Sequence, residues 1–137
     1  MINSEYLKMI LALPNEFFKG WGWKDGDSFI RLYDGHIGYL GNYKIDELSV
    51  QFTWGSTWAG CLEDIRPIPS QGQLIGMISN HSMLKTVKLT ELQVIERVSQ
   101  WHVRRDPCVI QNKCCEQLYL EVLQWLNDKT WDGETWI

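Results

Sequence analysis

The chain has 137 residues, of which 45% are apolar and 22% are charged, and its formal net charge is −4. This length suits one domain with one core, and the apolar content excludes an acidic disordered chain. Lysines and arginines are scattered, so the basic stripe that nucleic-acid phosphates require is absent. We therefore expect residues 1–137 to form a single domain that does not bind nucleic acid.

The chain also lacks the sequence signals of export and of membrane insertion. No apolar run approaches the roughly 20 residues that span a bilayer, and the N-terminus lacks the positive segment of a signal peptide. Among the cysteines, Cys114 and Cys115 are neighbours in a predicted helix, where their side chains diverge by about 100°. With Cys61 and Cys108 as the others, we expect no disulfide framework, no membrane partner and a cytoplasmic location.

A short helix opens the chain. Asn3 or Ser4 can cap its start, and Pro14 ends it because the residue before a proline avoids the α region. The apolar face of this helix is predicted to comprise Tyr6, Leu7, Ile10 and Leu11.

Residues 17–58 are rich in glycine and aromatic residues and predict a small antiparallel sheet. Asp25-Gly26 and Asp34-Gly35 are hairpin-type turn signals, because glycine accepts the positive φ that such turns need. Strand-forming residues occupy 29–33, 36–43 and 49–54. Three or four antiparallel strands are therefore expected here.

A helix over residues 71–79 follows the break at Pro67-Ile68-Pro69. Ser70 and Gln73 form a capping box, in which the side chain of each residue bonds the backbone amide of the other. This reciprocal cap marks the start of the helix.

The next segment, residues 84–105, fits two structures. Apolar residues that alternate with polar ones favour strand, turn, strand. A second capping box at Thr90-Glu91-Leu92-Gln93 would instead begin a helix. We expect the strand pair, with the helix as the alternative.

The clearest predicted element is a C-terminal helix that Asn112 would cap. Apolar residues recur at helical spacing on its buried face: Cys115, Leu118, Tyr119, Val122, Leu123 and Leu126. The tail from Trp131 to Trp136 is a turn between tryptophans, which we expect to fold back. Together these elements predict an α+β fold, a small antiparallel sheet packed with two to four helices.

Several features of the second half occur together in one kind of protein. They are the helix Pro67–Ser79, a strand pair ending in Gln100-Trp101-His102-Val103, the helix Leu118–Leu126 and the closing run Lys129-Thr130-Trp131-Asp132-Gly133-Glu134-Thr135-Trp136. This half resembles small proteins of phages and prophages, in particular the phage ABA-sandwich proteins. The resemblance implies an origin in a mobile element and a layered α/β packing, and it brings no catalytic residues.

Eight tryptophans are more than an ordinary chain of this length holds. Trp21 and Trp23 stand at strand spacing and would share one face of a sheet, while Trp54 and Trp58 lie four residues apart in a glycine-flanked segment. Such side chains either fill a small core or form a platform that stacks on a sugar, a base or a partner's side chain. We take these tryptophans as the predicted binding residues.

Metal sites are not expected from the sequence. Cys108, Cys114 and Cys115, together with His102, lack the paired spacing of zinc ligands. Asp25-Gly26-Asp27 resembles the opening of a calcium loop, but the glutamate that closes such a loop is missing.

Catalytic patterns are not evident either. His36 and His81 lie beside turn residues and should face solvent, and His102 should point outward from a strand. The nucleophile elbow of hydrolases and the glycine motifs that cradle phosphates do not occur. We expect no cofactor, and the balance is against an enzyme.

Three functions compete on this sequence. The favoured hypothesis is a non-enzymatic protein-interaction module of phage or prophage origin, with a host or phage protein as its partner. The alternative is a small-ligand-binding domain that uses an aromatic sheet face, and a small hydrolase or transferase comes third. A concave pocket that holds several of the tryptophans would favour the ligand-binding domain, and a histidine with an ordered carboxylate partner would favour the enzyme. The sequence leaves the oligomeric state open.

Overall fold

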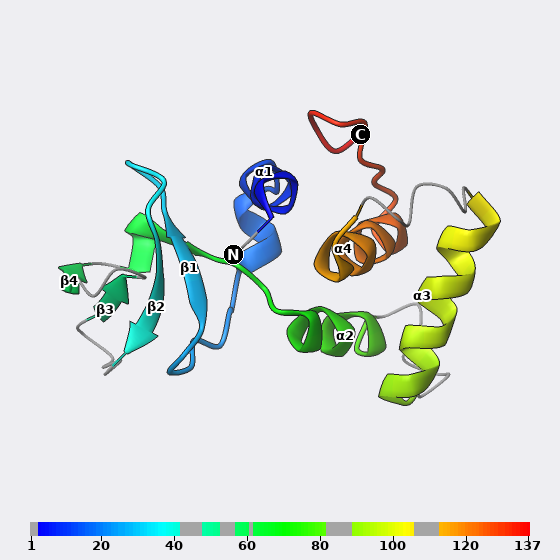
Figure 1. The fold of residues 1–137 in the computed structure, drawn as a ribbon, viewed down its shortest axis with the longest axis horizontal. Helices are drawn as coiled ribbons and strands as arrows, with labels where there is room; N and C mark the ends of the chain where they lie inside the picture. Colours follow the sequence, from blue (N-terminus) through cyan, green and yellow to red (C-terminus); the bar gives the residue numbers. More distant parts are fainter. Residues whose placement is uncertain (1–2, 42–47, 53–56, 61, 82–88, 106–112) are drawn as a thin grey trace. The chain divides into compact units, whose positions relative to one another are not determined.

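The computed structural model of the chain describes residues 3–41, 48–52, 57–60, 62–81, 89–105 and 113–137. The chain divides into two compact units, which we call the helical unit (Met1–Leu13 and Ser70–Ile137) and the sheet unit (Pro14–Pro69). Figure 1 traces the chain and labels α1 to α4 and β1 to β4. The fold class is α+β, as predicted, with an antiparallel sheet and helices in one small protein. That residues 1–137 form one domain stays a prediction.

The sheet unit contains one antiparallel sheet with the strand order β4-β3-β2-β1-β5 (Figure 1). Its strands are β1 (Ser28–Arg31), β2 (Ile37–Gly41), β3 (Leu48–Phe52), β4 (Thr57–Gly60) and β5 (Ile65–Pro67). The first three overlap the predicted segments 29–33, 36–43 and 49–54, while β4 was not located in advance, although three or four strands were expected. The fifth was not predicted, because prolines mark its end, yet an edge strand tolerates a proline whose missing N–H faces away from the ladder.

A tight turn joins β1 to β2. As the Asp34-Gly35 signal predicted, Gly35 adopts a positive φ of 75°. The Arg31 N–H donates to the His36 carbonyl over 2.8 Å, which closes the turn. β1 therefore ends at Arg31, earlier than predicted, and Leu32 and Tyr33 are exposed turn residues.

The helical unit consists of α1 (Ser4–Leu11), α2 (Gln71–Ser79), α3 (Glu91–Arg105) and α4 (Cys115–Leu126). α4 contacts α1, α2 and α3, so it forms the centre of this unit (Figure 1). Asn3 caps α1 by accepting from the N–H groups of Glu5 and Tyr6. The predicted capping box of α2 is present between Ser70 and Gln73. None of the helices within the described ranges is long and apolar enough to cross a membrane.

The prediction of two strands in segment 84–105 is wrong for residues 91–105, which form α3. Thr90 and Gln93 make the second capping box, and Val94, Val98 and His102 are buried at intervals of four residues. That spacing places them on one helix face, whereas in a strand the exposed Glu96 and Gln100 would share the side of the buried residues. The strand pair of the phage-type resemblance is thus helical at residues 100–103. Residues 84–88 lie outside the described ranges.

The buried face of α4 is broader than predicted. Cys115 is exposed and Leu118 is half-buried, whereas Gln117, Leu120 and Gln124 are buried. The reason is that α4 packs against α1, α2 and α3, so residues on more than one side of the helix are buried. Its N-cap is Cys114, and the predicted cap at residue 112 lies outside the described ranges.

The C-terminal tail folds back, as predicted. Trp131 and Trp136 pair across an antiparallel bridge with their ring centroids 5.0 Å apart. The Trp131 indole N–H donates to the Glu5 carboxylate, and the Trp136 indole N–H donates to the Met9 carbonyl, each over 3.1 Å. The tail is therefore fixed to α1 through both rings.

Candidate functional site

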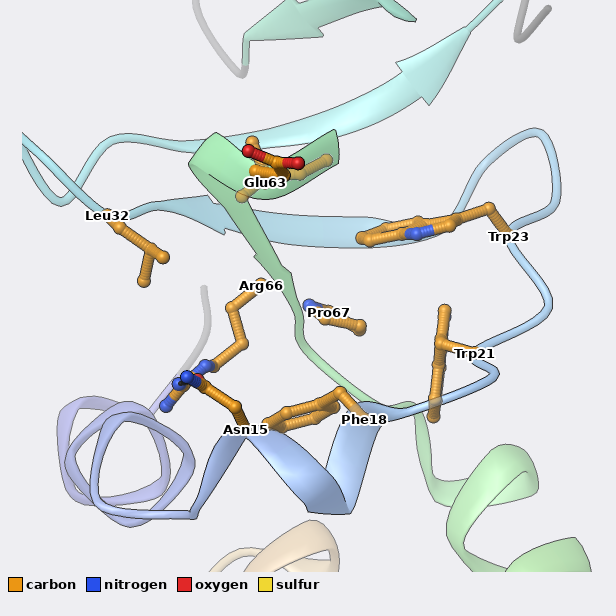
Figure 2. A pocket seen from close by; sticks show the side chains of 9 residues that line it. Asn15, Phe18, Trp21, Trp23, Leu32, Glu63, Arg66 and Pro67 are labelled. Atoms are coloured by element: carbon orange, nitrogen blue, oxygen red, sulfur yellow. Dashed lines mark hydrogen bonds between the residues drawn. The ribbon is translucent and has the colours of Figure 1, made fainter. Parts of the chain in front are cut away.

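A pocket of about 370 Å³ opens in the sheet unit, with polar and aromatic side chains in its walls (Figure 2). Its volume is within the usual range for small-molecule sites. The residues that line it are Asn15, Phe18, Trp21, Trp23, Leu32, Glu63, Ile65, Arg66 and Pro67. We call it the aromatic pocket.

One wall comes from a short 3-10 helix and the irregular segment that follows it. The helix η1 (Asn15–Phe18) starts after Pro14. Gly20, with a φ of 77°, lets the chain reverse so that the backbone N–H of Trp21 donates to the Phe18 carbonyl. As a result the Phe18 and Trp21 rings meet edge to face, with centroids 6.2 Å apart.

Another wall is the edge strand β5. Ile65 and Pro67 are buried, while Arg66 between them is half-buried and reaches the pocket. Arg66 Nη2 donates to Asn15 Oδ1 over 2.6 Å, and Cζ lies 5.2 Å from the centroid of the Phe18 ring. Arg66 is half-buried, and this burial lowers the pKa of its guanidinium. Two contacts thus hold a partly desolvated cation against an aromatic wall.

Trp21 carries an unusual donor. Its Nε1 atom is buried and has no hydrogen-bond partner within the part of the chain that the structure describes. A buried donor without an acceptor costs about 1–3 kcal/mol, and such groups call for an explanation such as a bound molecule. The ring that lines the pocket is therefore not anchored through its polar atom.

The structure brings two of the predicted binding residues together. Trp21 and Trp23 both line the aromatic pocket, although they lie in an irregular segment before β1 and not on a strand. Trp58 belongs to β4, and its side chain lies outside the description. Trp54 lies outside the described ranges.

The polar groups of the pocket were not found from the sequence. Arg66 and Asn15 are 51 positions apart along the chain, so no local pattern joins them. A weak signal existed in Ile65-Arg66-Pro67, where a charged residue stands between two apolar ones, as on an edge strand with one face covered.

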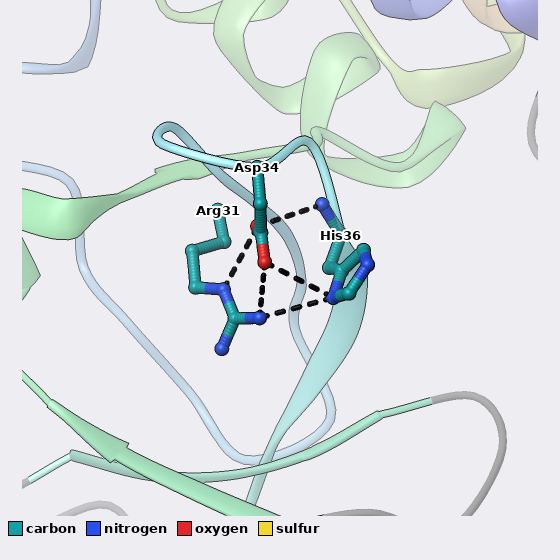
Figure 3. Close-up of polar contacts among 3 residues, drawn as sticks. All are labelled: Arg31, Asp34 and His36. Atoms are coloured by element: carbon teal, nitrogen blue, oxygen red, sulfur yellow. Dashed lines mark hydrogen bonds and ion pairs between the residues drawn. The ribbon is translucent and has the colours of Figure 1, made fainter.

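His36 has an ordered carboxylate partner at the β1–β2 turn (Figure 3). Its Nδ1 lies 3.1 Å from Asp34 Oδ2 and 3.0 Å from Arg31 Nη2, and its backbone N–H donates to Asp34 Oδ1. Arg31 donates to the same carboxylate from Nε, over 2.9 Å, and from Nη2. The Arg31 guanidinium, together with the backbone N–H and the ring of His36, lowers the pKa of the Asp34 carboxyl to about 2. The Asp34 carboxylate thus links Arg31 and His36 at the two ends of the turn.

His102 differs from its prediction. It does not point outward from a strand but is buried in α3, with only 5% of its surface exposed. Its Nε2 contacts the Leu118 carbonyl at 2.9 Å, and its Nδ1 lies 3.8 Å from Glu121 Oε2. Lys113 pairs with the same glutamate at 2.6 Å. These contacts join α3 to α4 and leave a substrate no access to the ring.

His81 is half-buried and bonds Asn127 at 2.7 Å, so it does not simply face solvent. Across the described ranges, no group of three or more His, Cys, Asp or Glu side chains is arranged to hold a metal ion. Cys114 and Cys115 are free thiols, and burial raises the pKa of Cys114, which disfavours its thiolate. Cys61 and Cys108 lie outside the described ranges.

Comparison with known proteins adds no relative to this picture. No family model matches the chain, and no curated protein or solved structure matches it. The site must therefore be interpreted from its own geometry.

Proposed function

We propose that the chain is a non-enzymatic binding protein and that the aromatic pocket holds its ligand. The observation that carries the proposal is the convergence of Phe18, Trp21 and Trp23 with Asn15 and Arg66 in one concave site. Ligand sites combine apolar and aromatic walls with polar groups that fix orientation, and this pocket contains both kinds of group. Ring faces favour a flat ligand, since they stack on planar groups.

The composition of the pocket supports binding over catalysis. The residues that line it include no histidine, cysteine, serine or lysine, and Glu63 is the one carboxylate among them, so no nucleophile stands beside a base in its described wall. His36 and His102 have carboxylate partners, but their contacts close a turn and join two helices. Neither histidine lines this pocket.

Titration of ¹⁵N-labelled protein with indole tests the proposal. We expect the indole N–H signals of Trp21 and Trp23 to shift and saturate, with assignments from Trp21→Phe and Trp23→Phe. Trp131 and Trp136 serve as internal controls, because their N–H groups already bond Glu5 and Met9. Equal, non-saturating shifts of all tryptophan signals would contradict a specific pocket.

A protein-interaction module of phage or prophage origin is the second candidate. It is supported by large apolar side chains that α3 and α4 expose, namely Leu92 at 78%, Val103 at 50% and Trp125 at 45%. Exposed apolar groups of this size mark interaction surfaces when they gather. The test compares proteins captured from a bacterial lysate by the wild type and by Leu92→Ser and Trp125→Ser, which should lose a specific partner while they remain folded.

A further inference from the structure

Two opposite charges line the aromatic pocket, one contributed by Arg66 and one by Glu63. Glu63 belongs to the short helix η2 (Leu62–Asp64), is exposed, and makes no hydrogen bond or ion pair with any described residue. The two side chains therefore do not neutralise each other by direct contact. Figure 2 shows Glu63 and Arg66 apart, with Trp21 and Trp23 to their right and Phe18 below.

The Arg66 end is built to present a fixed cation. The bond to Asn15 Oδ1 and the position over the Phe18 ring restrict the guanidinium, so less side-chain freedom is lost when a ligand binds. A guanidinium with a set orientation suits a carboxylate, which it meets with two parallel N–H groups.

The ring walls supply the second requirement. Phe18, Trp21 and Trp23 are the aromatic residues that line the pocket, and the contact between Phe18 and Trp21, with centroids 6.2 Å apart, keeps two of the rings in place. An aromatic ligand gains both apolar burial and ring–ring contact in such a site.

From these observations we infer that the ligand is an aromatic zwitterion, a compound in which a flat ring carries a carboxylate and an ammonium group, as in an aromatic amino acid. This inference rests on the proposed function of the aromatic pocket. A ligand with one charge meets one attraction and one repulsion there, because the wall carries one cation and one anion. A zwitterion meets two attractions, with its carboxylate toward Arg66 and its ammonium toward Glu63.

Three ligands with the same indole ring separate the charge contributions. Indole-3-propionate carries the carboxylate alone, tryptamine carries the ammonium alone, and tryptophan carries both. Dissociation constants come from the Trp21 and Trp23 signals of the full-length protein. We expect tryptophan to bind about tenfold more tightly than either of the others, the usual gain from one charge-assisted hydrogen bond.

Variants assign each charge to its residue. Arg66→Gln should remove the preference for tryptophan over tryptamine, and Glu63→Gln should remove the preference over indole-3-propionate. Arg104→Gln and Glu96→Gln are matched controls, because they change the net charge in the same way on α3, outside the lining of the pocket. Arg66→Lys keeps the charge without the planar fork and should retain part of the preference, which covers a failure of Arg66→Gln to fold.

The outcomes separate this inference from the proposed function. If all three compounds and indole bind equally and the variants behave like the controls, the pocket binds aromatic rings but the zwitterion inference is wrong. If none of the four compounds shifts the Trp21 and Trp23 signals, both are wrong.

Discussion

The helical unit and the sheet unit both contain tryptophans, but the hydrogen bonding of the indole N–H groups differs between Trp131 and Trp136 in the first and Trp21 in the second. In the helical unit, Trp131 and Trp136 donate their indole N–H groups to Glu5 and Met9, and both rings fix the tail to α1. In the sheet unit, the indole N–H of Trp21 is buried without a described acceptor, and the Trp21 ring lines a pocket. An abundance of tryptophan therefore does not indicate a binding surface by itself. The hydrogen-bond partner of the indole distinguishes Trp131 and Trp136, which fix the tail, from Trp21 in the pocket.

The largest expected effect tests whether the helical unit is held by its packed interior. Leu123 is only 3% exposed in α4, so Leu123→Ala should lower the free energy of unfolding by about 2–5 kcal/mol, through lost burial and the cavity that remains. Leu118→Ala should cost less, since Leu118 is half-buried. Urea denaturation provides the measurement, and Leu92→Ala is the exposed control. An unchanged midpoint for Leu123→Ala would show that α4 does not form this core.

The next prediction tests the contrast between tryptophans directly. Trp136→Phe removes a donor from the Met9 carbonyl, whereas Trp21→Phe removes a donor that has no described acceptor. Both side chains are half-buried, so the losses of ring contact are similar. Trp136→Phe should therefore lower stability by about 1 kcal/mol more than Trp21→Phe does, as measured by urea denaturation. Equal losses would mean that the indole N–H bond does not separate the two classes.

The sequence predicted the elements that local patterns determine, and it missed an element that depends on contacts with distant residues. The capping box at Ser70, the turn at Asp34-Gly35 and the folded-back tail are local patterns, and each was predicted. α3 was missed because its alternating residues also fit strands, and the burial of Val94 and Val98 against neighbouring helices decides the matter.

The candidate site was predicted in part for the same reason. Trp21 and Trp23 could be singled out as abundant aromatics close together in the sequence. Arg66 and Asn15 could not, because their contact joins residues from η1 and the edge strand β5. No period or motif within one segment encodes such a pair.

An effect of similar size is expected at the start of α3, where the sequence offered two structures. Thr90 accepts from the Gln93 N–H, and Gln93 accepts from the Thr90 N–H in return. Thr90→Ala should destabilise the protein by about 0.5–2 kcal/mol, because one N–H at the helix start loses its acceptor. Thr90→Ser, which keeps the hydroxyl, is the control. Carbon chemical shifts of residues 91–94 provide a local measurement, and no change there would argue against the cap.

The last and smallest expected effect lies in the acid response of the sheet unit. Two turn aspartates have a lowered pKa, one in each unit. Asp132 of the tail owes its low pKa mainly to the N–H groups of Thr135 and Glu134, whereas Asp34 owes its value of about 2 mainly to Arg31. Both are exposed residues, so solvent screens the benefit of their charge. The two differ in what binds the charge, a guanidinium in one case and backbone amides in the other.

The sign of the pH effect follows from the direction of the shift. The pKa of Asp34 in the folded protein lies below its ordinary 3.8, so its charge stabilises the folded state above that pH, and the benefit is lost as the pH falls through about 2. Asp34→Asn keeps the oxygen that accepts from the His36 N–H but removes the charge that Arg31 binds. The difference in urea midpoint between wild type and Asp34→Asn should therefore be constant above pH of about 4 and should vanish near the folded pKa. Asp132→Asn, measured in parallel, shows whether a turn held by backbone amides responds alike. A difference at Asp34 that persists below its pKa would mean that hydrogen-bond geometry, and not the charge, closes the β1–β2 turn.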